Sequence, residues 1–340
     1  MLIRKRMYLL SPRLPLGVVT FCLILFLLSE ITSVAEFIDR FICFPIRIFF
    51  SSLNGLFAFP LFELAVALSP LLIVFLLCAV RNGAYCLPLF LLAFLIFCYT
   101  SVLAIPAKKE KTHPDIENLS DDAFFEAATR TIELLALETE ESENEKNREE
   151  LSIIALKLAS VQSDNTAQIN QQPAIKVKSS LFPGILDRLN IYGYLAFPTA
   201  EIIVSPNLPK VLLPITVAHE VRHFMGSSRE EEAVFESYLC CVSSDDRYVR
   251  YCAHLYAYRK ISAVLYNRNP ELYFSLLNSL PKRVRDDIVA CNSYESSKRD
   301  SRACRASEKL NDLAIKMRDS RGKASYSYSC ALIADYITSQ

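Results

Sequence analysis

Apolar and polar residues are distributed differently in two parts of the chain, which meet near residue 106. Long apolar runs dominate the first part, whereas charged residues are frequent in the second part and its apolar positions recur at short intervals. A chain of 340 residues is long enough to bury two cores. We therefore expect a membrane domain over residues 1–106, a helical linker region over 107–173 and a compact domain over 174–340.

Three apolar runs in the first part have the length of a transmembrane helix, which needs roughly twenty residues. They cover residues 14–31, 64–80 and 85–105, and only a very short turn separates the second from the third. The first run follows a basic cluster, so a cleavable signal peptide is an alternative interpretation. Because no small-residue cleavage site follows it and further apolar runs come soon after, we expect about three retained transmembrane helices.

The segment 41–62, between the first and second runs, is apolar but interrupted by proline and glycine, and it contains Arg47. A charged side chain is costly in the bilayer core, so we expect this segment to be interfacial or re-entrant. The basic cluster before the first run places the N-terminus in the cytoplasm, and three spans then place everything after residue 106 outside. A fourth span in this segment would instead move that part to the cytoplasmic side.

Beyond residue 106 the apolar positions first recur at helical spacing and then alternate. Helical spacing is found over 120–135 and 151–161, and apolar and polar residues alternate over 174–179 as in a half-buried strand. Two further strand candidates are 191–195 and 201–204. The expected fold class is mainly α, with N-terminal transmembrane helices and a small sheet that could pair with an extended peptide.

An HExxH motif follows the predicted sheet and comprises His219, Glu220 and His223. Residues i and i+4 lie on one face of a helix, so both imidazoles can bind a single Zn²⁺ ion, with Glu220 beside them as general base. Zinc lowers the pKa of a bound water and polarises a carbonyl, which is the chemistry of peptide hydrolysis. Only four histidines occur in the chain, and two of them are in this motif. The motif predicts that the compact domain is a zincin-like α+β catalytic domain.

The third metal ligand is predicted from the residues after the motif. Gly226 is a typical helix end, and a helix beginning with an acidic triplet follows it. Glu230 is our choice, because Glu230-x-x-Ala233 resembles the ExxA element in which gluzincin-type peptidases carry their glutamate ligand. Arginine stands at position 229, where HExxHxxGxxH proteins have a third histidine, and arginine does not ligate. Glu231 and Glu232 are the alternatives, and the triplet is also explained by compensation of the helix dipole.

The next predicted helix, over residues 244–265, contains two possible hydrogen-bond donors. Tyr251 and His254 are candidates to stabilise the oxyanion of a tetrahedral intermediate, alongside Glu220 in the catalytic set. The alternative interpretation, that both are ordinary residues of the helix surface or core, remains open.

Composition excludes several other classes of protein. The formal net charge is zero, without the basic stripe that nucleic-acid binding requires, and the seven glycines form no phosphate-binding loop motif. The eleven cysteines form no CxxC pair, which disfavours a structural zinc ribbon. Cys291 and Cys304 flank a polar segment predicted to be a loop, so a disulfide between them is a hypothesis, with buried free thiols as the alternative.

Taken together, these stretches resemble a bacterial membrane-protein family catalogued as domain of unknown function 3810, whose members carry an HExxH signature after about three transmembrane helices. The resemblance runs along most of the chain, over residues 59–63, 194–201, 213–220, 230–238 and 311–336. It implies a zinc-dependent peptidase anchored in the bacterial cytoplasmic membrane by contact with the lipid bilayer. Peptides or proteins would be its substrates, and the catalytic domain would be extracytoplasmic.

Three residues depart from the pattern of that family. Arg222 occupies a place usually held by a small residue, Ala200 replaces a glycine, and Val234 replaces a polar asparagine. Loss of a polar side chain at 234 would remove a hydrogen bond that supports the site. The sequence therefore predicts a membrane-anchored zinc metallopeptidase, with two alternatives. One is a catalytically inactive sensor or scaffold that binds peptides or partner proteins, and the other is a purely structural membrane protein.

Overall fold

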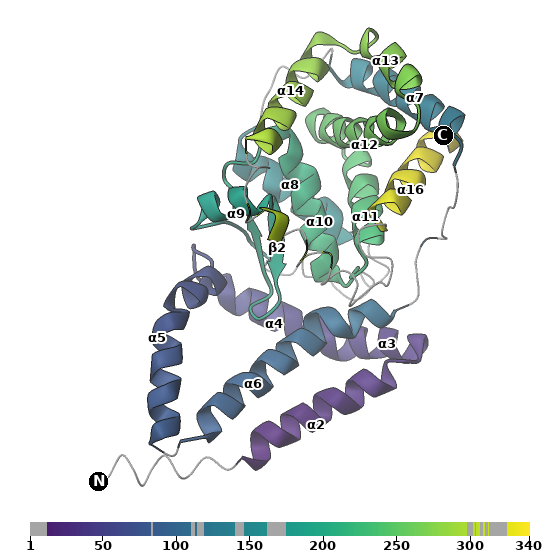
Figure 1. Ribbon diagram of the computed structural model, residues 1–340. Coiled ribbons are helices and arrows are strands. Elements are labelled where there is room, and N and C mark those ends of the chain that lie inside the picture. The colour runs from purple at the N-terminus through teal and green to yellow at the C-terminus, as the bar shows by residue number, and fades with distance from the viewer. Residues whose placement is uncertain are drawn as a thin grey trace. The chain divides into compact units, whose positions relative to one another are not determined.

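The computed structural model describes residues 12–82, 84–109, 113, 119–139, 146–161, 175–297, 302, 304–306, 309, 312 and 325–340. It is mainly helical with one small sheet, as the sequence predicts (Figure 1). The chain forms two compact units. Unit 1 comprises Met1–Glu110, Pro173–Leu181 and Ala196–Glu201, and unit 2 comprises Lys111–Gln172, Phe182–Leu195 and Ile202–Gln340.

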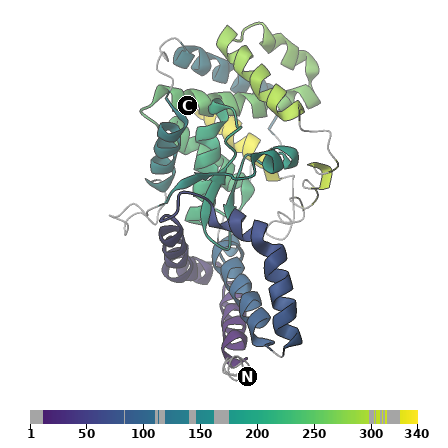
Figure 2. The same cartoon turned by 90° about the vertical axis from the view of Figure 1, so that its left-hand side faces the viewer.

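Unit 1 contains two helical stretches that are long and apolar enough to cross a membrane, Leu61–Arg81 and Cys86–Lys108. The first is helix α5, and the second begins with α6 (Cys86–Tyr99). They form a hairpin whose closed end is at the bottom of Figures 1 and 2. Only 6% of the most apolar window of α5 is buried in the protein, as expected for a helix that faces lipid on most sides.

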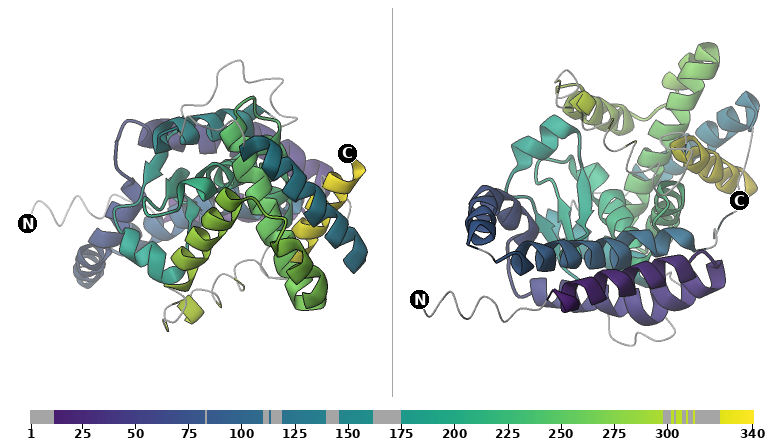
Figure 3. Two further views of the ribbon diagram at one scale, coloured as in Figure 1. Left: turned by 90° about the horizontal axis from the view of Figure 1, so that it is seen from above. Right: turned by 60° about the horizontal axis from the view of Figure 1, so that its bottom comes forward.

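The first predicted span corresponds to α2 (Arg13–Leu28), which is apolar but has only 16 residues. It packs alongside α6 (Figure 3, right). Because a perpendicular span needs roughly twenty residues, two candidate spans are found among the described residues, and the third stays a prediction.

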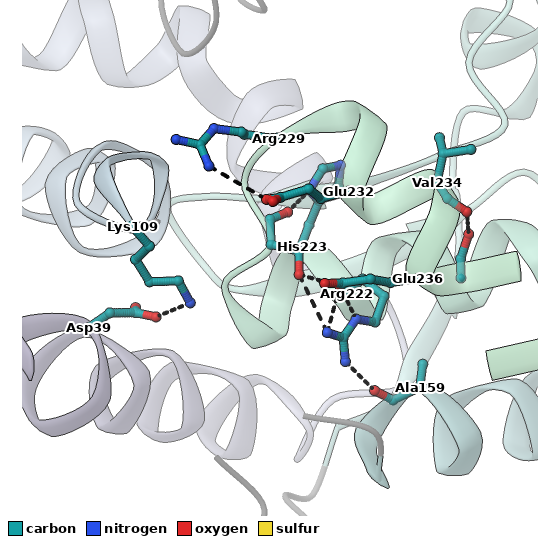
Figure 4. A network of polar contacts seen from close by, with 11 residues as sticks. Asp39, Lys109, Ala159, Arg222, His223, Arg229, Glu232, Val234 and Glu236 are labelled. Atoms are coloured by element: carbon teal, nitrogen blue, oxygen red, sulfur yellow. Dashed lines mark hydrogen bonds and ion pairs between the residues drawn. The ribbon is translucent and has the colours of Figure 1, made fainter. Parts of the chain in front are cut away.

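The predicted interfacial segment is helical over most of its length. Helix α3 (Thr32–Ile38) continues through a π-helical turn, η1 (Asp39–Cys43), into α4 (Phe44–Asn54). Arg47 is fully buried and donates hydrogen bonds to Asp39 Oδ1 at 2.8 Å and to the carbonyl of Ser101 at 3.1 Å. Lys109 pairs with the other oxygen of Asp39 at 3.0 Å (Figure 4). These partners offset part of the cost of burying the Arg47 charge, since Nη1 is bonded whereas Nε and Nη2 have no partner among the described residues. Removal of Asp39 would leave the charge without its ion-pair partner.

A second buried polar cluster in unit 1 lies at the start of α5. The Glu201 carboxylate accepts hydrogen bonds from the Leu61 and Phe62 amides at 2.9 and 2.8 Å and from Lys178 at 2.6 Å. Glu63 likewise accepts from the Ser180 hydroxyl. Two carboxylates therefore tie short segments from the second half of the sequence to the first turn of a candidate membrane span, where helix N-H groups need acceptors.

Unit 2 is built around helix α10 (Leu213–Met225), in which every residue except His219 is buried. Helices α8 (Arg148–Val161), α11 (Glu230–Val242) and α12 (Arg247–Arg268) pack against it. The remaining helices of the described part are α7 (Asp121–Thr139), α9 (Pro183–Leu189), α13 (Pro270–Leu277), α14 (Lys282–Ser296) and α16 (Ser325–Ser339).

The three strands are β1 (Val177–Ser179), β2 (Gly193–Ala196) and β3 (Glu201–Val204), in the order β1-β3-β2. All three predicted strands are found, and β3 has the predicted bounds. Ala200, in the turn between β2 and β3, has a φ of 52°, which lies in the left-handed region.

The predicted disulfide between Cys291 and Cys304 is wrong, because neither cysteine is disulfide-bonded and both are buried. The physical reason lies in the segment between them. Helix α14 continues to Ser296, so the first residues of the predicted loop are helical and hold Cys291 in the helix packing. Both side chains are at most 1% exposed and pack as small apolar groups.

Candidate metal centre

The turn after α10 places the candidate ligands. Gly226 ends the helix with a φ of 106°, a conformation that glycine adopts without the steric penalty of a Cβ atom. The Gly226 amide donates to the His223 carbonyl at 3.1 Å, and the Ser227 amide donates to the Arg222 carbonyl at 2.9 Å. This is the Schellman pair of bonds, which satisfies the last carbonyls of the helix and reverses the chain. Helix α11 then begins at Glu230, with Arg229 in the N-cap position and no side-chain cap.

His219, His223 and Glu230 come together, as the sequence predicts. The Nε2 atoms of the two histidines are 3.1 Å apart, and their rings meet edge to face. Glu230 places one carboxylate oxygen 3.4 Å from His219 Nε2 and the other 3.6 Å from His223 Nε2. Among the described residues these three form the group able to hold a metal ion, and Glu231 and Glu232 are not part of it. Glu232 instead pairs with Arg229 at 3.8 Å (Figure 4).

These spacings fit zinc. Ligand bonds of about 2.0 to 2.2 Å arranged as a tetrahedron put neighbouring donor atoms about 3.3 Å apart. The separation of the two histidine nitrogens lies close to that value, and one ligand atom from each of the three residues lies within 4.8 Å of the others. Two imidazole nitrogens and one carboxylate oxygen are also the donor set of a catalytic zinc site, which keeps one position for water or substrate. The side chain of His219 is 20% exposed, so the cluster is reachable from solvent on that side.

The electrostatics of Glu230 favour its ionised form. Burial by itself would raise the pKa of Glu230, but the charge of His223 and hydrogen bonds from both histidines outweigh it. They hold the pKa of Glu230 well below its usual range. The carboxylate is therefore ready to bind a cation.

The outer nitrogen of His223 has a main-chain acceptor. His223 Nδ1 is 2.7 Å from the carbonyl oxygen of Ser227, and a carbonyl only accepts, so Nδ1 carries the proton. In a neutral imidazole the proton on Nδ1 leaves Nε2 with its lone pair, which is the tautomer that a metal needs. His223 thus has an acceptor without a polar side chain at Val234, which is buried and whose carbonyl accepts from Ser237 (Figure 4).

A buried ion pair lies behind that carbonyl. Arg222 contacts Glu236 through Nε at 2.6 Å and through a terminal nitrogen at 2.5 Å (Figure 4). The Ser227 hydroxyl donates to the same Glu236 oxygen at 2.5 Å. The sequence showed that Arg222 is unusual but gave it no partner, and Glu236 and Ser227 were missed. A buried charge beside a metal motif was the available signal, since such a charge needs a partner.

Glu220 is buried on α10, in the turn that separates the two histidines. A buried carboxylate is costly unless it is paired or hydrogen-bonded. The expected role of Glu220 as general base stays a prediction.

The two predicted oxyanion donors have other surroundings. Tyr251 is fully buried and donates a hydrogen bond of 2.5 Å to Asp287 on α14; burial and this bond raise the pKa of its phenol. His254 packs edge-on against Tyr238, and burial lowers its pKa to about 4. Its Nδ1 has no hydrogen-bond partner among the described residues. Both residues are thus buried in the packing of α12, and their role as oxyanion donors stays a prediction.

Tyr256, one turn further along α12, is partly exposed, and the Lys260 ammonium lies 5.3 Å from the centre of its ring. Burial raises the pKa of the Tyr256 phenol, Lys260 opposes this rise, and the Glu230 carboxylate adds to it. Sequence reasoning did not single out Tyr256 among the tyrosines of this helix.

Comparison with known proteins gives one match. A family model described as "Protein of unknown function (DUF3810)" matches residues 40–334. Neither the search of curated proteins nor the search of solved structures found a match. The matched region includes all three candidate ligands and both candidate spans.

Proposed function

We propose that this chain, which belongs to the DUF3810 family, is a membrane-anchored zinc metallopeptidase, on the strength of its three-ligand cluster. The observation that carries the proposal is the convergence of His219, His223 and Glu230, with one ligand atom from each within 4.8 Å of the others, the donor set of a catalytic zinc site. These residues would hold Zn²⁺. The bound ion would supply Lewis acidity, which acidifies water and polarises a peptide carbonyl.

The chain's own residues account for the proton transfers. Glu220 accepts the proton of the attacking water and then delivers it to the leaving amine. Because a carboxylate serves as base in the first step and as acid in the second, one residue suffices. Tyr251, His254 and Tyr256, all on α12, are the proposed candidates to donate to the developing oxyanion.

The substrates proposed are peptides or proteins near a bilayer. Two helices long and apolar enough to cross a membrane support an anchor in the lipid, and the resemblance to a bacterial family supports the cytoplasmic membrane. The catalytic part is proposed to be extracytoplasmic, on the charge distribution around the first apolar run.

The decisive experiment compares the full chain, purified in detergent, with Glu220→Gln. We expect about one zinc per chain in both proteins, and hydrolysis of a peptide library only by the wild type, with at least a hundredfold loss in the variant, roughly the worth of a general base. Tyr256→Phe should keep zinc and KM but lower kcat. Wild-type protein without zinc would reject the proposal. Zinc without any turnover would support the inactive sensor or scaffold instead.

A further inference from the structure

We propose that Arg222 and Glu236 are positioning residues for the metal ligand His223, acting through Ser227. The inference rests on the proposed function, because it concerns the same metal site. It gives a role to the arginine that departs from the family pattern, and it names the group that replaces a polar side chain at position 234.

Ser227 forms hydrogen bonds through three groups: its amide and its hydroxyl donate to neighbouring residues, and its carbonyl accepts from the metal ligand His223. Its amide donates to the Arg222 carbonyl at 2.9 Å, and its hydroxyl donates to Glu236 at 2.5 Å. Its carbonyl accepts the Nδ1 proton of His223 at 2.7 Å. With the amide and the hydroxyl fixed, the direction of the carbonyl is fixed too. That direction determines the ring orientation of His223 and keeps its Nε2 aimed at the metal.

Arg222 and Glu236 hold the Ser227 hydroxyl in place. Their side chains are 7% and 10% exposed, and the pair joins α10 to α11, the two helices that carry the ligands. A third contact, from Arg222 Nη1 to the Ala159 carbonyl at 3.3 Å, reaches α8 (Figure 4). A weaker contact of 3.5 Å runs from Arg222 to the Ser227 hydroxyl. The Glu236 oxygen nearest Ser227 therefore has little freedom to move.

Stability alone does not account for a buried ion pair at this place. Removing two charges from water costs several kcal/mol per ion, and well-packed apolar residues are often as good or better for folding. A pair that orients a metal ligand has a use that apolar residues cannot replace. The same logic holds for ligating histidines generally, whose outer nitrogen is held by a hydrogen bond that supports affinity or activity by tenfold to a hundredfold.

The test uses the full chain in detergent and two readouts that need no turnover. Zinc affinity is measured by competition with a chelator, and the visible spectrum of the cobalt(II)-loaded protein reports the ligand geometry. We expect Glu236→Gln to weaken zinc binding by roughly ten- to a hundredfold and Ser227→Ala by about tenfold, each with a changed cobalt spectrum. The two together should weaken it by less than the product of the single effects, since both act on one carbonyl.

Arg229→Gln is the matched control. Arg229 and Glu232 form the neighbouring ion pair in the same turn, 3.8 Å apart, and Glu232 is outside the three-ligand cluster. Zinc affinity and the cobalt spectrum should stay at the wild-type values in this variant. Replacing both charges, Arg222→Met with Glu236→Met, avoids leaving one charge buried alone, so a folded protein is available for the comparison.

A third readout separates the failure of this inference from failure of the metal proposal. In metal-free protein labelled with ¹⁵N-histidine, the nitrogen spectrum shows whether His223 carries its proton on Nδ1. We expect that tautomer in the wild type and a mixture in the paired methionine variant. Wild type without zinc would reject both proposals. Zinc bound equally tightly by wild type and paired variant, with identical cobalt and nitrogen spectra, would overturn the positioning role alone.

Discussion

Ala200 adopts a left-handed backbone conformation, with a φ of 52°, although it carries a Cβ atom. For residues with a side chain this conformation costs about 1 to 2 kcal/mol, because the Cβ approaches the following carbonyl oxygen. Alanine at this position therefore stores a small amount of strain in the turn between β2 and β3.

Ala200→Gly should raise the free energy of unfolding by about 1 kcal/mol, because glycine relieves this strain at a smaller cost in chain entropy. Chemical denaturation of the full chain in detergent measures the change. Ala196→Gly is the control, since Ala196 is a buried residue of β2 without a positive φ, and there glycine should destabilise. Equal effects of the two substitutions would show that the φ at 200 carries no strain.

Individual residues of the site differ in how far the sequence determines them. His219 and His223 are set by a fixed helical repeat, so their shared face follows from spacing alone. Glu230 follows from the glycine turn. The N-cap position of α11 belongs to Arg229, and the Ser227 hydroxyl donates to Glu236. A hydroxyl has several partners within reach, and only the folded packing selects one.

Among the elements, the turn between α10 and α11 contributes most to the geometry of the candidate metal site. Its glycine ends one ligand helix, and the residue after it orients a ligand of the same helix. The turn geometry and the metal geometry are therefore set by the same peptide units.

Gly226→Ala should lower the free energy of unfolding by about 1 to 2 kcal/mol and also weaken zinc binding, because a φ of 106° is strained for alanine and relief of that strain moves the Ser227 carbonyl. Unfolding curves and chelator competition measure the two effects. Gly184→Ala, in α9, is the control: a Cβ at Gly184 meets nothing within 4 Å, so both quantities should stay close to wild type. A destabilised Gly226→Ala protein with unchanged zinc affinity would separate the turn from the metal site.

Elements with a strong local pattern could be predicted, and elements defined by distant partners could not. The strand at 201–204 was found with its predicted bounds, and the acidic start predicted for the helix after Gly226 is the first turn of α11. The continuation of α14 past Cys291 was not predicted, because polar residues on an exposed helix and in a loop look alike. Arg47 was expected to be costly in lipid, and its pairing with Asp39 depends on packing that periodicity does not encode.

At the scale of the whole molecule, the side of the membrane on which the candidate site lies follows from the number of spans. We predict that a cysteine introduced at exposed Arg285, in α14, reacts with a membrane-impermeant maleimide on intact cells, because three spans with a cytoplasmic N-terminus put it outside. A cysteine introduced at exposed Asn82, after α5, should be protected. Reaction only after cell lysis at position 285 would indicate two or four spans and a cytoplasmic site.

The contacts of the carboxylates at the start of α5 limit how far the chain can be divided into fragments that fold independently. Glu201 and Lys178 come late in the sequence, yet their partners include the Leu61 and Phe62 amides and the Asn54 carbonyl, within unit 1. A fragment that begins just after the last apolar run would keep Lys178 and Glu201 but would lack these hydrogen-bond partners. Truncation or fusion at that point would leave the same charges without these partners, so the start of α5 takes part in the packing of the later segments.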